Sequence, residues 1–129
     1  MHMTNIGFIT PNKVLAQSIS SAITARPDLG FQSYALLDPH QAALDVEVLQ
    51  IDVAVVDVME GGPAQTQATL AFCKRLRRAA PACRVLLLLS QDDQAGKEMA
   101  VGAVRDGIAA DFAFYDTSLE YLFAKLSAV

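Results

Sequence analysis

The chain has 129 residues, of which 53% are hydrophobic and 19% charged, a composition that supports one well-filled core and excludes a disordered chain. The longest apolar run, Val85 to Leu89, is too short to span a membrane, and Met1 to Thr4 lack the charged and apolar regions of a signal peptide. A net charge of −4 argues against a large phosphate-backbone footprint. We therefore expect a cytoplasmic protein with no nucleic-acid and no membrane partner.

Strand and helix signals alternate from the start of the chain. Ile6 to Ile9 form a short apolar strand. Thr10 and Pro11 then predict a helix start, with a hydroxyl N-cap followed by proline at the first helical position. An apolar stripe at helical spacing continues this helix until shortly before Pro27.

The next two units repeat this pattern. Phe31 to Leu36 predict the second strand, and the pair Asp38 and Pro39 starts a helix that runs through about Leu49. The third strand, Val53 to Asp57, is apolar at nearly every position. Such a run is typical of a central parallel strand that is buried on both faces.

The fourth unit begins after a Gly61–Pro63 loop with a helix from about Ala64 to Ala79. Arg84 to Leu89 predict the fourth strand, again apolar on both faces. A helix from about Ala95 to Asp106 follows, and Gly107 is expected to end it in the left-handed conformation.

The last unit has a strand within Asp111 to Phe114 and a helix whose start, Thr117 to Glu120, fits a capping box. Five strand–helix units predict an α/β fold: a doubly wound five-stranded parallel sheet with helices on both faces. No linker or repeat divides the sequence, so residues 1–129 are expected to form a single domain.

In parallel sheets of this kind the active crevice lies beyond the carboxyl ends of the strands. The residues expected there are Thr10, Pro11, Asp57, Met59, Ser90 and Phe114 to Asp116. Asp57 is the most informative, because a carboxylate that ends a hydrophobic strand is costly unless it reaches the crevice or a partner. Asp57 as a simple cap of the next loop and Ser90 as an ordinary turn residue are the structural alternatives.

Three segments carry a resemblance to a known family: IDVAVVDVMEGG from Ile51, VLLLLSQDD from Val85 and AVRDGIAADFAFYDTSLEYL from Ala103. In their order and spacing they resemble the receiver domains of two-component response regulators. The resemblance covers nearly the whole chain and implies the flavodoxin-like (βα)5 receiver fold. It places Asp57 at the phosphoacceptor position and Ser90 at the switch position.

The same resemblance implies that other groups of the family are lost. The acidic pair that binds Mg²⁺ with the phosphoacceptor falls on Thr10 and Pro11, neither of which is a carboxylate. The family's lysine at the end of the fifth strand falls on Phe114, Tyr115 or Asp116, and no lysine occurs between Lys97 and Lys125. We therefore expect no cofactor, no metal ion and in particular no Mg²⁺.

The leading hypothesis is a degenerate receiver, or pseudo-receiver, that acts through protein–protein contacts and is not an enzyme. The alternative is a phosphorylatable receiver that accepts phosphate on Asp57. A flavodoxin-like small-molecule binder or enzyme is a third hypothesis, disfavoured by the lack of a phosphate loop, a nucleophile–base set and a cofactor motif. The partner would be a histidine kinase or an output domain. A homodimer through the fourth helix, fifth strand and fifth helix is also expected, because residues 112–121 are rich in aromatic side chains.

Three further features have a functional and a structural interpretation. Lys13 is either a counter-ion of Asp57 or an exposed residue of the first helical turn. The basic run from Lys74 to Arg78 is better explained as a solvated helix end than as a nucleic-acid site. Cys73 and Cys83 do not form a CxxC motif and are expected to be reduced, structural thiols.

Overall fold

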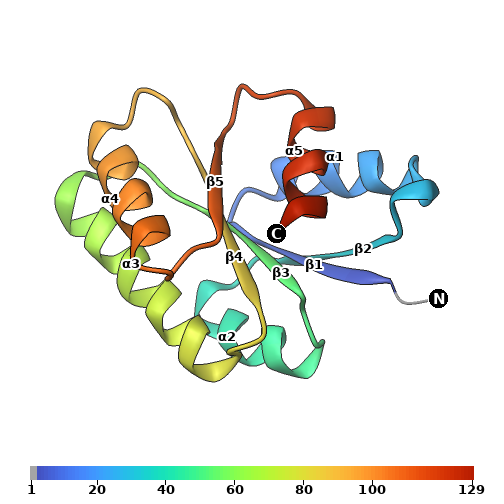
Figure 1. Cartoon of the computed structure of the whole chain (residues 1–129), viewed down its shortest axis with the longest axis horizontal. Coiled ribbons are helices and arrows are strands. Elements are labelled where there is room, and N and C mark those ends of the chain that lie inside the picture. Colours follow the sequence, from blue (N-terminus) through green and yellow to red (C-terminus); the bar gives the residue numbers. More distant parts are fainter. Residues whose placement is uncertain (1–2) are drawn as a thin grey trace.

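The computed structural model describes residues 3–129. Met1 and His2, part of the segment expected to lack a targeting signal, lie outside them. Five parallel strands form one sheet in the order β2-β1-β3-β4-β5, which confirms the predicted doubly wound topology (Figure 1). The strands are β1 (Thr4–Ile9), β2 (Phe31–Leu36), β3 (Val53–Asp57), β4 (Arg84–Leu89) and β5 (Asp111–Phe114).

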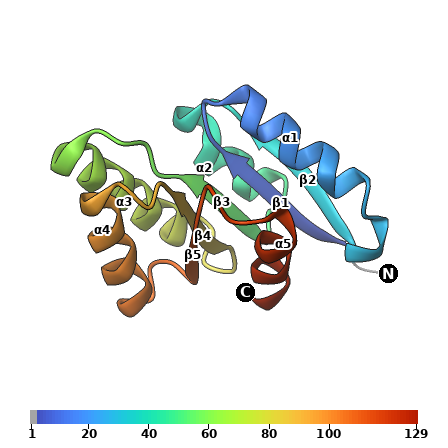
Figure 2. The same cartoon turned by 90° about the horizontal axis from the view of Figure 1, so that it is seen from above.

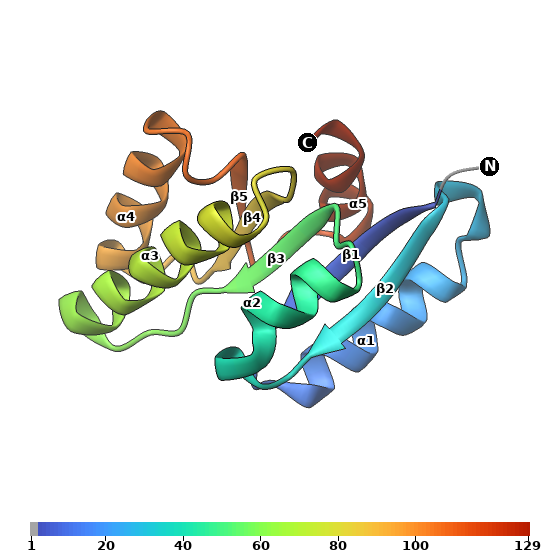
Figure 3. The ribbon, with the colours of Figure 1, turned by 90° about the horizontal axis from the view of Figure 1, so that it is seen from below.

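Helices cover both faces of the sheet. They are α1 (Lys13–Thr24), α2 (Pro39–Val48), α3 (Gly62–Ala79), α4 (Gln94–Arg105) and α5 (Leu119–Ala128), with a short 3-10 helix η1 (Pro27–Leu29). One face packs against α1 and α5 and the other against α2, α3 and α4 (Figures 2 and 3). Within the described residues, no helix is long and apolar enough to cross a membrane.

The core consists of two layers separated by the sheet. Because strand side chains alternate between faces, Val53 and Val55 of β3 pack toward α1 and α5, whereas Ala54 and Val56 pack toward α2, α3 and α4. All four side chains are buried. The continuous apolar runs of β3 and β4 therefore reflect burial on both faces, and Asp57 is the first polar residue at the carboxyl end of β3.

The start of α1 differs from the sequence prediction. Its N-cap is Asn12, whose side chain accepts a hydrogen bond of 3.0 Å from the backbone N–H of Leu15, so Thr10 and Pro11 precede the helix. The prediction failed because the Thr10 hydroxyl is engaged by a residue distant in sequence. The start of α5 is shifted in the same way: its N-cap is Ser118, not Thr117.

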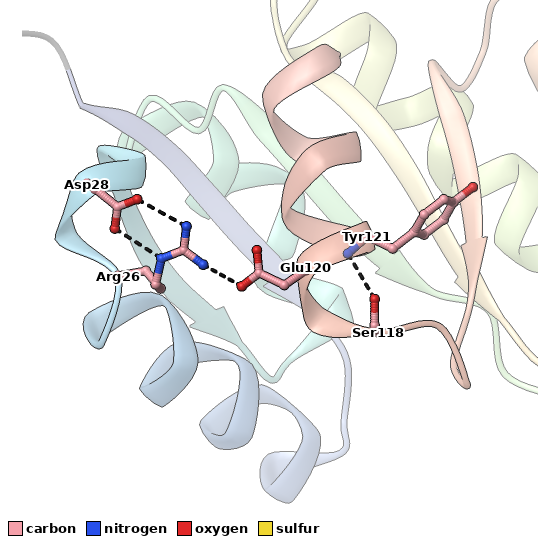
Figure 4. A network of polar contacts seen from close by, with 5 residues as sticks. All are labelled: Arg26, Asp28, Ser118, Glu120 and Tyr121. Atoms are coloured by element: carbon pink, nitrogen blue, oxygen red, sulfur yellow. Dashed lines mark hydrogen bonds and ion pairs between the residues drawn. The ribbon is translucent and has the colours of Figure 1, made fainter.

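An exposed polar network connects two segments that are far apart in sequence. The Arg26 guanidinium makes two hydrogen bonds of 3.0 Å to the carboxylate of Asp28 and also contacts the carboxylate of Glu120 in the first turn of α5 (Figure 4). Ser118, which caps that helix, accepts a hydrogen bond from the backbone N–H of Tyr121. Because Glu120 pairs with Arg26, it is not the reciprocal partner that a capping box would require.

Candidate functional site

The candidate site is centred on Asp57 and Thr10. Asp57 is the last residue of β3, and Thr10 directly follows the neighbouring strand β1. The Thr10 hydroxyl donates a hydrogen bond of 2.6 Å to Oδ2 of Asp57. The same hydroxyl oxygen accepts a hydrogen bond of 3.0 Å from the backbone N–H of Asn12. Thr10 is buried. Its hydroxyl therefore links the carboxylate of Asp57 to the loop that leads into α1.

The second carboxylate oxygen of Asp57 has no such partner. Oδ1 is enclosed by protein, and no hydrogen bond reaches it from the described part of the chain. Burial raises the pKa of Asp57 above its usual value, and the hydrogen bond from Thr10 opposes that rise without cancelling it. The site thus holds a carboxyl group whose ionised form is poorly stabilised.

Lys13 does not provide the missing positive charge. It is exposed at the first position of α1, and among residues 3–129 no ion pair joins it to Asp57. No cation contributes to the pKa shift of Asp57. Lys13 thus has the exposed first-turn position in this structure, and its role as a counter-ion of Asp57 stays a prediction.

Ser90 lies beyond the level of Asp57. In the parallel pairing of β3 with β4, Asp57 is opposite Leu88. Ser90 comes two residues after Leu88, just past the carboxyl end of β4. Its hydroxyl accepts a hydrogen bond of 3.2 Å from the backbone N–H of Asp92. In this conformation Ser90 stabilises the turn before α4 and has no contact with the carboxylate of Asp57 among the hydrogen bonds of the described residues.

The pairing of β4 with β5 fixes where Phe114, Tyr115 and Asp116 lie relative to β4. Phe114 is opposite Leu89 and packs with the α2–α4 layer, whereas the backbone N–H of Tyr115 donates to the carbonyl of Leu89. The Tyr115 side chain lines an open cavity together with Asp57. Asp116 instead accepts a hydrogen bond from Gln91. Of the three candidate positions, only Tyr115 lines one of the two open cavities that flank Asp57.

Two open cavities flank Asp57. One, of about 520 Å³, lies toward the loops after β1, β3 and β5 and includes Asn12, Glu60 and Tyr115 in its lining. The other, of about 440 Å³, lies toward α2 and α3. It is lined by Ile9, Pro11, Pro39, His40, Val56, Asp57, Met59, Gln65, Ala68, Thr69, Phe72 and Arg75. Sequence reasoning missed His40, Phe72 and Arg75 as site residues, because no local motif marks them.

The donor set does not suit Mg²⁺, which needs several oxygen ligands in near-octahedral geometry. The Thr10 hydroxyl donates a hydrogen bond to Asp57, and Pro11 has no side-chain oxygen. Asp57 itself offers one engaged and one enclosed oxygen. No group of three His, Cys, Asp or Glu side chains within residues 3–129 is placed to hold a metal ion. The crevice around Asp57 therefore does not fit the metal that receiver domains use.

Comparison with known proteins adds information on the fold. No protein-family model and no curated protein matches the sequence. Among solved structures, Vibrio cholerae chemotaxis protein CheY4 is 17% identical, with 98% of each chain covered and a TM-score of 0.73. The receiver domain of the Francisella response regulator 1452 is 18% identical, covering 97% of this chain and 94% of that one, with a TM-score of 0.74.

A third match has an enzyme's name. A structure described as adenylate cyclase from Rhodopirellula baltica is 16% identical, covers 98% of this chain and 86% of that one, and has a TM-score of 0.79. At these identities the matches show the fold alone. That fold is the CheY-like receiver fold, as the sequence resemblance implied.

Proposed function

We propose that this chain is a degenerate receiver of the two-component type, which transmits signals through protein–protein contacts without efficient phosphorylation of Asp57. The observation that carries the proposal is the direct hydrogen bond from Thr10 to Asp57, at the place where the resemblance predicts a metal-binding carboxylate. Tyr115, at the lysine position, lines the same crevice. Both replacements remove groups that would hold or neutralise a phosphoryl group.

The chemistry of phosphoryl transfer explains why these replacements matter. Catalysis of this reaction depends on positioning and on stabilising the charge of the equatorial oxygens. Among the described residues Asp57 has no metal site and no ion pair, so the charge of a phosphoryl group attached to it would not be neutralised. Burial also raises the pKa of Asp57, so its carboxylate is less stabilised than that of a solvated aspartate.

A surface suited to protein contacts supports the second half of the proposal. Large apolar side chains are exposed on α4, at the end of β5 and on α5: Val101, Tyr115, Leu119 and Tyr121. Aromatic side chains often supply much of the binding energy at protein interfaces. We infer a cytoplasmic module whose partner is a histidine kinase, an output domain or a second copy of the chain.

The test is exposure to acetyl phosphate with excess Mg²⁺, followed by intact-mass measurement. We expect no stoichiometric phosphorylation under conditions that label a typical receiver domain, and calorimetry should detect no specific Mg²⁺ binding in the millimolar range. An Asp57→Ala variant controls for labelling elsewhere. Rapid Asp57-dependent labelling, or Mg²⁺-dependent NMR shifts that saturate at Asp57 and Thr10, would overturn the degenerate-receiver assignment.

The alternative, slow phosphorylation of Asp57, is favoured by one observation: both Asp57 and Ser90 are kept at the ends of adjacent strands. This function predicts Mg²⁺ binding together with slow, partial labelling of Asp57 by a histidine kinase or a small phosphodonor. In neither case do we propose an enzyme. Even if Asp57 accepted a phosphoryl group from a small donor, the chain itself would be the molecule that is modified.

A further inference from the structure

The cavity between α2 and α3 has the volume, the lining and the position in the sheet of a ligand site. Its volume of about 440 Å³ lies within the range of about 300–1,000 Å³ that is usual for small-molecule pockets. Its walls are mostly apolar and include Ile9, Val56 and Phe72. The cavity lies at the switch point between β1 and β3, where the order of the parallel strands changes direction and where open α/β sheets bind ligands. Figure 3 shows α2 and α3 on the same face of the sheet, on either side of β3.

Two basic side chains line this cavity. The Arg75 guanidinium lies over the Phe72 ring, 5.7 Å from its centroid, and has no hydrogen bond or ion pair among the described residues. His40, in the first turn of α2, lines the same space. An arginine held against an aromatic ring and without a carboxylate partner is prepared to bind an anion bidentately.

Acidic residues are absent from the segment that carries Arg75. No Asp or Glu occurs from Gly61 to Gln91, a stretch that includes all of α3 and β4. Half of the ten lysines and arginines of the chain lie in this stretch: Lys74, Arg75, Arg77, Arg78 and Arg84. Of these five only Arg75 lines the cavity, and α3 has no Asp or Glu that could pair with it.

The lost acidic pair removes the charge that would otherwise repel an anion from this crevice. Thr10 and Pro11 are neutral, and Asp57, the one acidic residue in the lining, accepts a hydrogen bond from Thr10. We propose that the cavity binds a small apolar carboxylate, with its carboxylate group at Arg75 and His40 and its apolar body against Ile9, Val56 and Phe72. A neutral or cationic molecule of the same shape would lack the ion pair with Arg75.

This inference deepens the proposed function, because a bound anion would provide the input that phosphorylation does not. It rests on that function only for its biological meaning. Labelling of Asp57 by acetyl phosphate would overturn the degenerate-receiver assignment and leave the binding result unaffected. Failure of the binding test would leave the phosphorylation result unaffected.

The test uses three probes that share one ring system and differ in charge: 2-naphthoate, 2-naphthamide and 2-naphthylmethylammonium. Because the chain has no tryptophan, the naphthalene fluorescence can be titrated directly. We expect saturable binding of 2-naphthoate and binding at least about tenfold weaker for the other two, the ratio expected for loss of one charge-assisted contact. Amide NMR shifts should be largest at His40, Thr69 and Phe72.

Three variants locate the site. Arg75→Gln should weaken 2-naphthoate binding about tenfold. Arg78→Gln removes the same charge from an exposed position of α3 that does not line the cavity, so it should leave the affinity nearly unchanged. Ala68→Phe adds bulk at the exposed rim of the cavity and should abolish binding, with circular dichroism used to confirm that the variant is folded.

Several results would overturn the proposal. They are non-saturable binding of 2-naphthoate, equal affinities for the three probes, equal effects of Arg75→Gln and Arg78→Gln, and NMR shifts confined to α4, β5 and α5. The last result would assign the probe to the exposed apolar surface formed by α4, the end of β5 and α5.

Discussion

Oδ2 of Asp57 accepts a hydrogen bond from the hydroxyl of Thr10 over 2.6 Å, and the two residues are separated by 47 positions in the sequence. Two carboxylates at this distance would repel each other and require a cation between them. A hydroxyl makes the same contact attractive and needs no ion. A threonine at position 10 therefore stabilises the carboxylate of Asp57 without a metal ion.

The first prediction concerns the energy of this contact. Thr10→Val should lower the free energy of unfolding by about 1–2 kcal/mol, because it leaves Oδ2 of Asp57 and the N–H of Asn12 without their partner. Asp57→Ala should leave the fold intact and change stability by less than about 1 kcal/mol, since it also removes the unpaired Oδ1. A loss above about 2 kcal/mol for Asp57→Ala would identify Asp57 as structural.

A double-mutant cycle measures the coupling between the two side chains. If the contact is as direct as the structure shows, urea unfolding of Thr10→Val/Asp57→Ala should reveal a loss smaller than the sum of the two single losses. Additive effects would mean that the hydrogen bond does not contribute in solution.

The second prediction is a pH dependence. Burial raises the pKa of Asp57, so the folded state binds a proton at a pH where the unfolded carboxyl, with a pKa of about 3.9, has lost it. Below that pH the two states are equally protonated, and as the pH rises through the folded pKa the wild type loses stability. Asp57→Asn, which keeps an acceptor for Thr10, should therefore gain stability relative to wild type as the pH rises above about 4. Thermal unfolding across this range measures the difference, and the opposite trend would show a stabilised carboxylate.

The third prediction is a gain of function. The triple variant Thr10→Asp/Pro11→Asp/Tyr115→Lys restores the groups that the receiver resemblance implies around Asp57. It should bind Mg²⁺ in the millimolar range and raise acetyl phosphate labelling more than about tenfold, because a metal ion supplies several kcal/mol of charge stabilisation. The same triple variant carrying Asp57→Ala should not be labelled. A triple variant that folds but stays unlabelled would place the cause of inactivity outside these three positions.

The fourth prediction concerns self-association through α4, β5 and α5. We expect light scattering to show a homodimer at high micromolar concentration, since Tyr115 and Tyr121 are 41% and 50% exposed on this surface. Tyr115→Glu should shift the equilibrium to monomer. Leu44→Glu provides the matched control, because Leu44 is an apolar residue of α2, 54% exposed, outside the proposed interface. A wild type that remains monomeric would leave a different protein as the partner of this surface.

The fifth prediction separates the two candidate caps of α5. Ser118→Ala should cost about 1 kcal/mol of stability, because the Ser118 hydroxyl accepts from the N–H of Tyr121 (Figure 4). Thr117→Ala should cost less than about 0.5 kcal/mol. Urea unfolding of both variants decides the assignment, and a larger effect at Thr117 would restore the sequence prediction.

The sequence predicts most of the fold because burial on both faces leaves a strong signal. The bounds of β2 to β5 agree with the predicted strands, and Gly107 has the left-handed backbone expected at the end of α4, with φ of 75°. The helix starts near Thr10 and Thr117 were misplaced, because local capping patterns cannot show a hydroxyl engaged elsewhere or the better of two adjacent caps.

The site was only partly predictable for the same reason. The sequence alone singled out Asp57, whereas the finding that Tyr115, and not Phe114, lines a cavity with Asp57 required the structure. Arg75 and His40 come together only because α2 and α3 pack on one face of the sheet. No spacing in the sequence encodes that proximity.

Alkylation of the two cysteines can report how often the packing between α3 and β4 opens. Cys73 and Cys83 are free and buried, and burial raises their pKa values to about 12 and about 11. A protonated, enclosed thiol does not react with thiol reagents, so alkylation has to await exposure of this layer. The alkylation rate of the unmodified protein thus measures how often α3 separates from the sheet. A molecule that binds between α2 and α3 should slow that rate, without any label having been introduced.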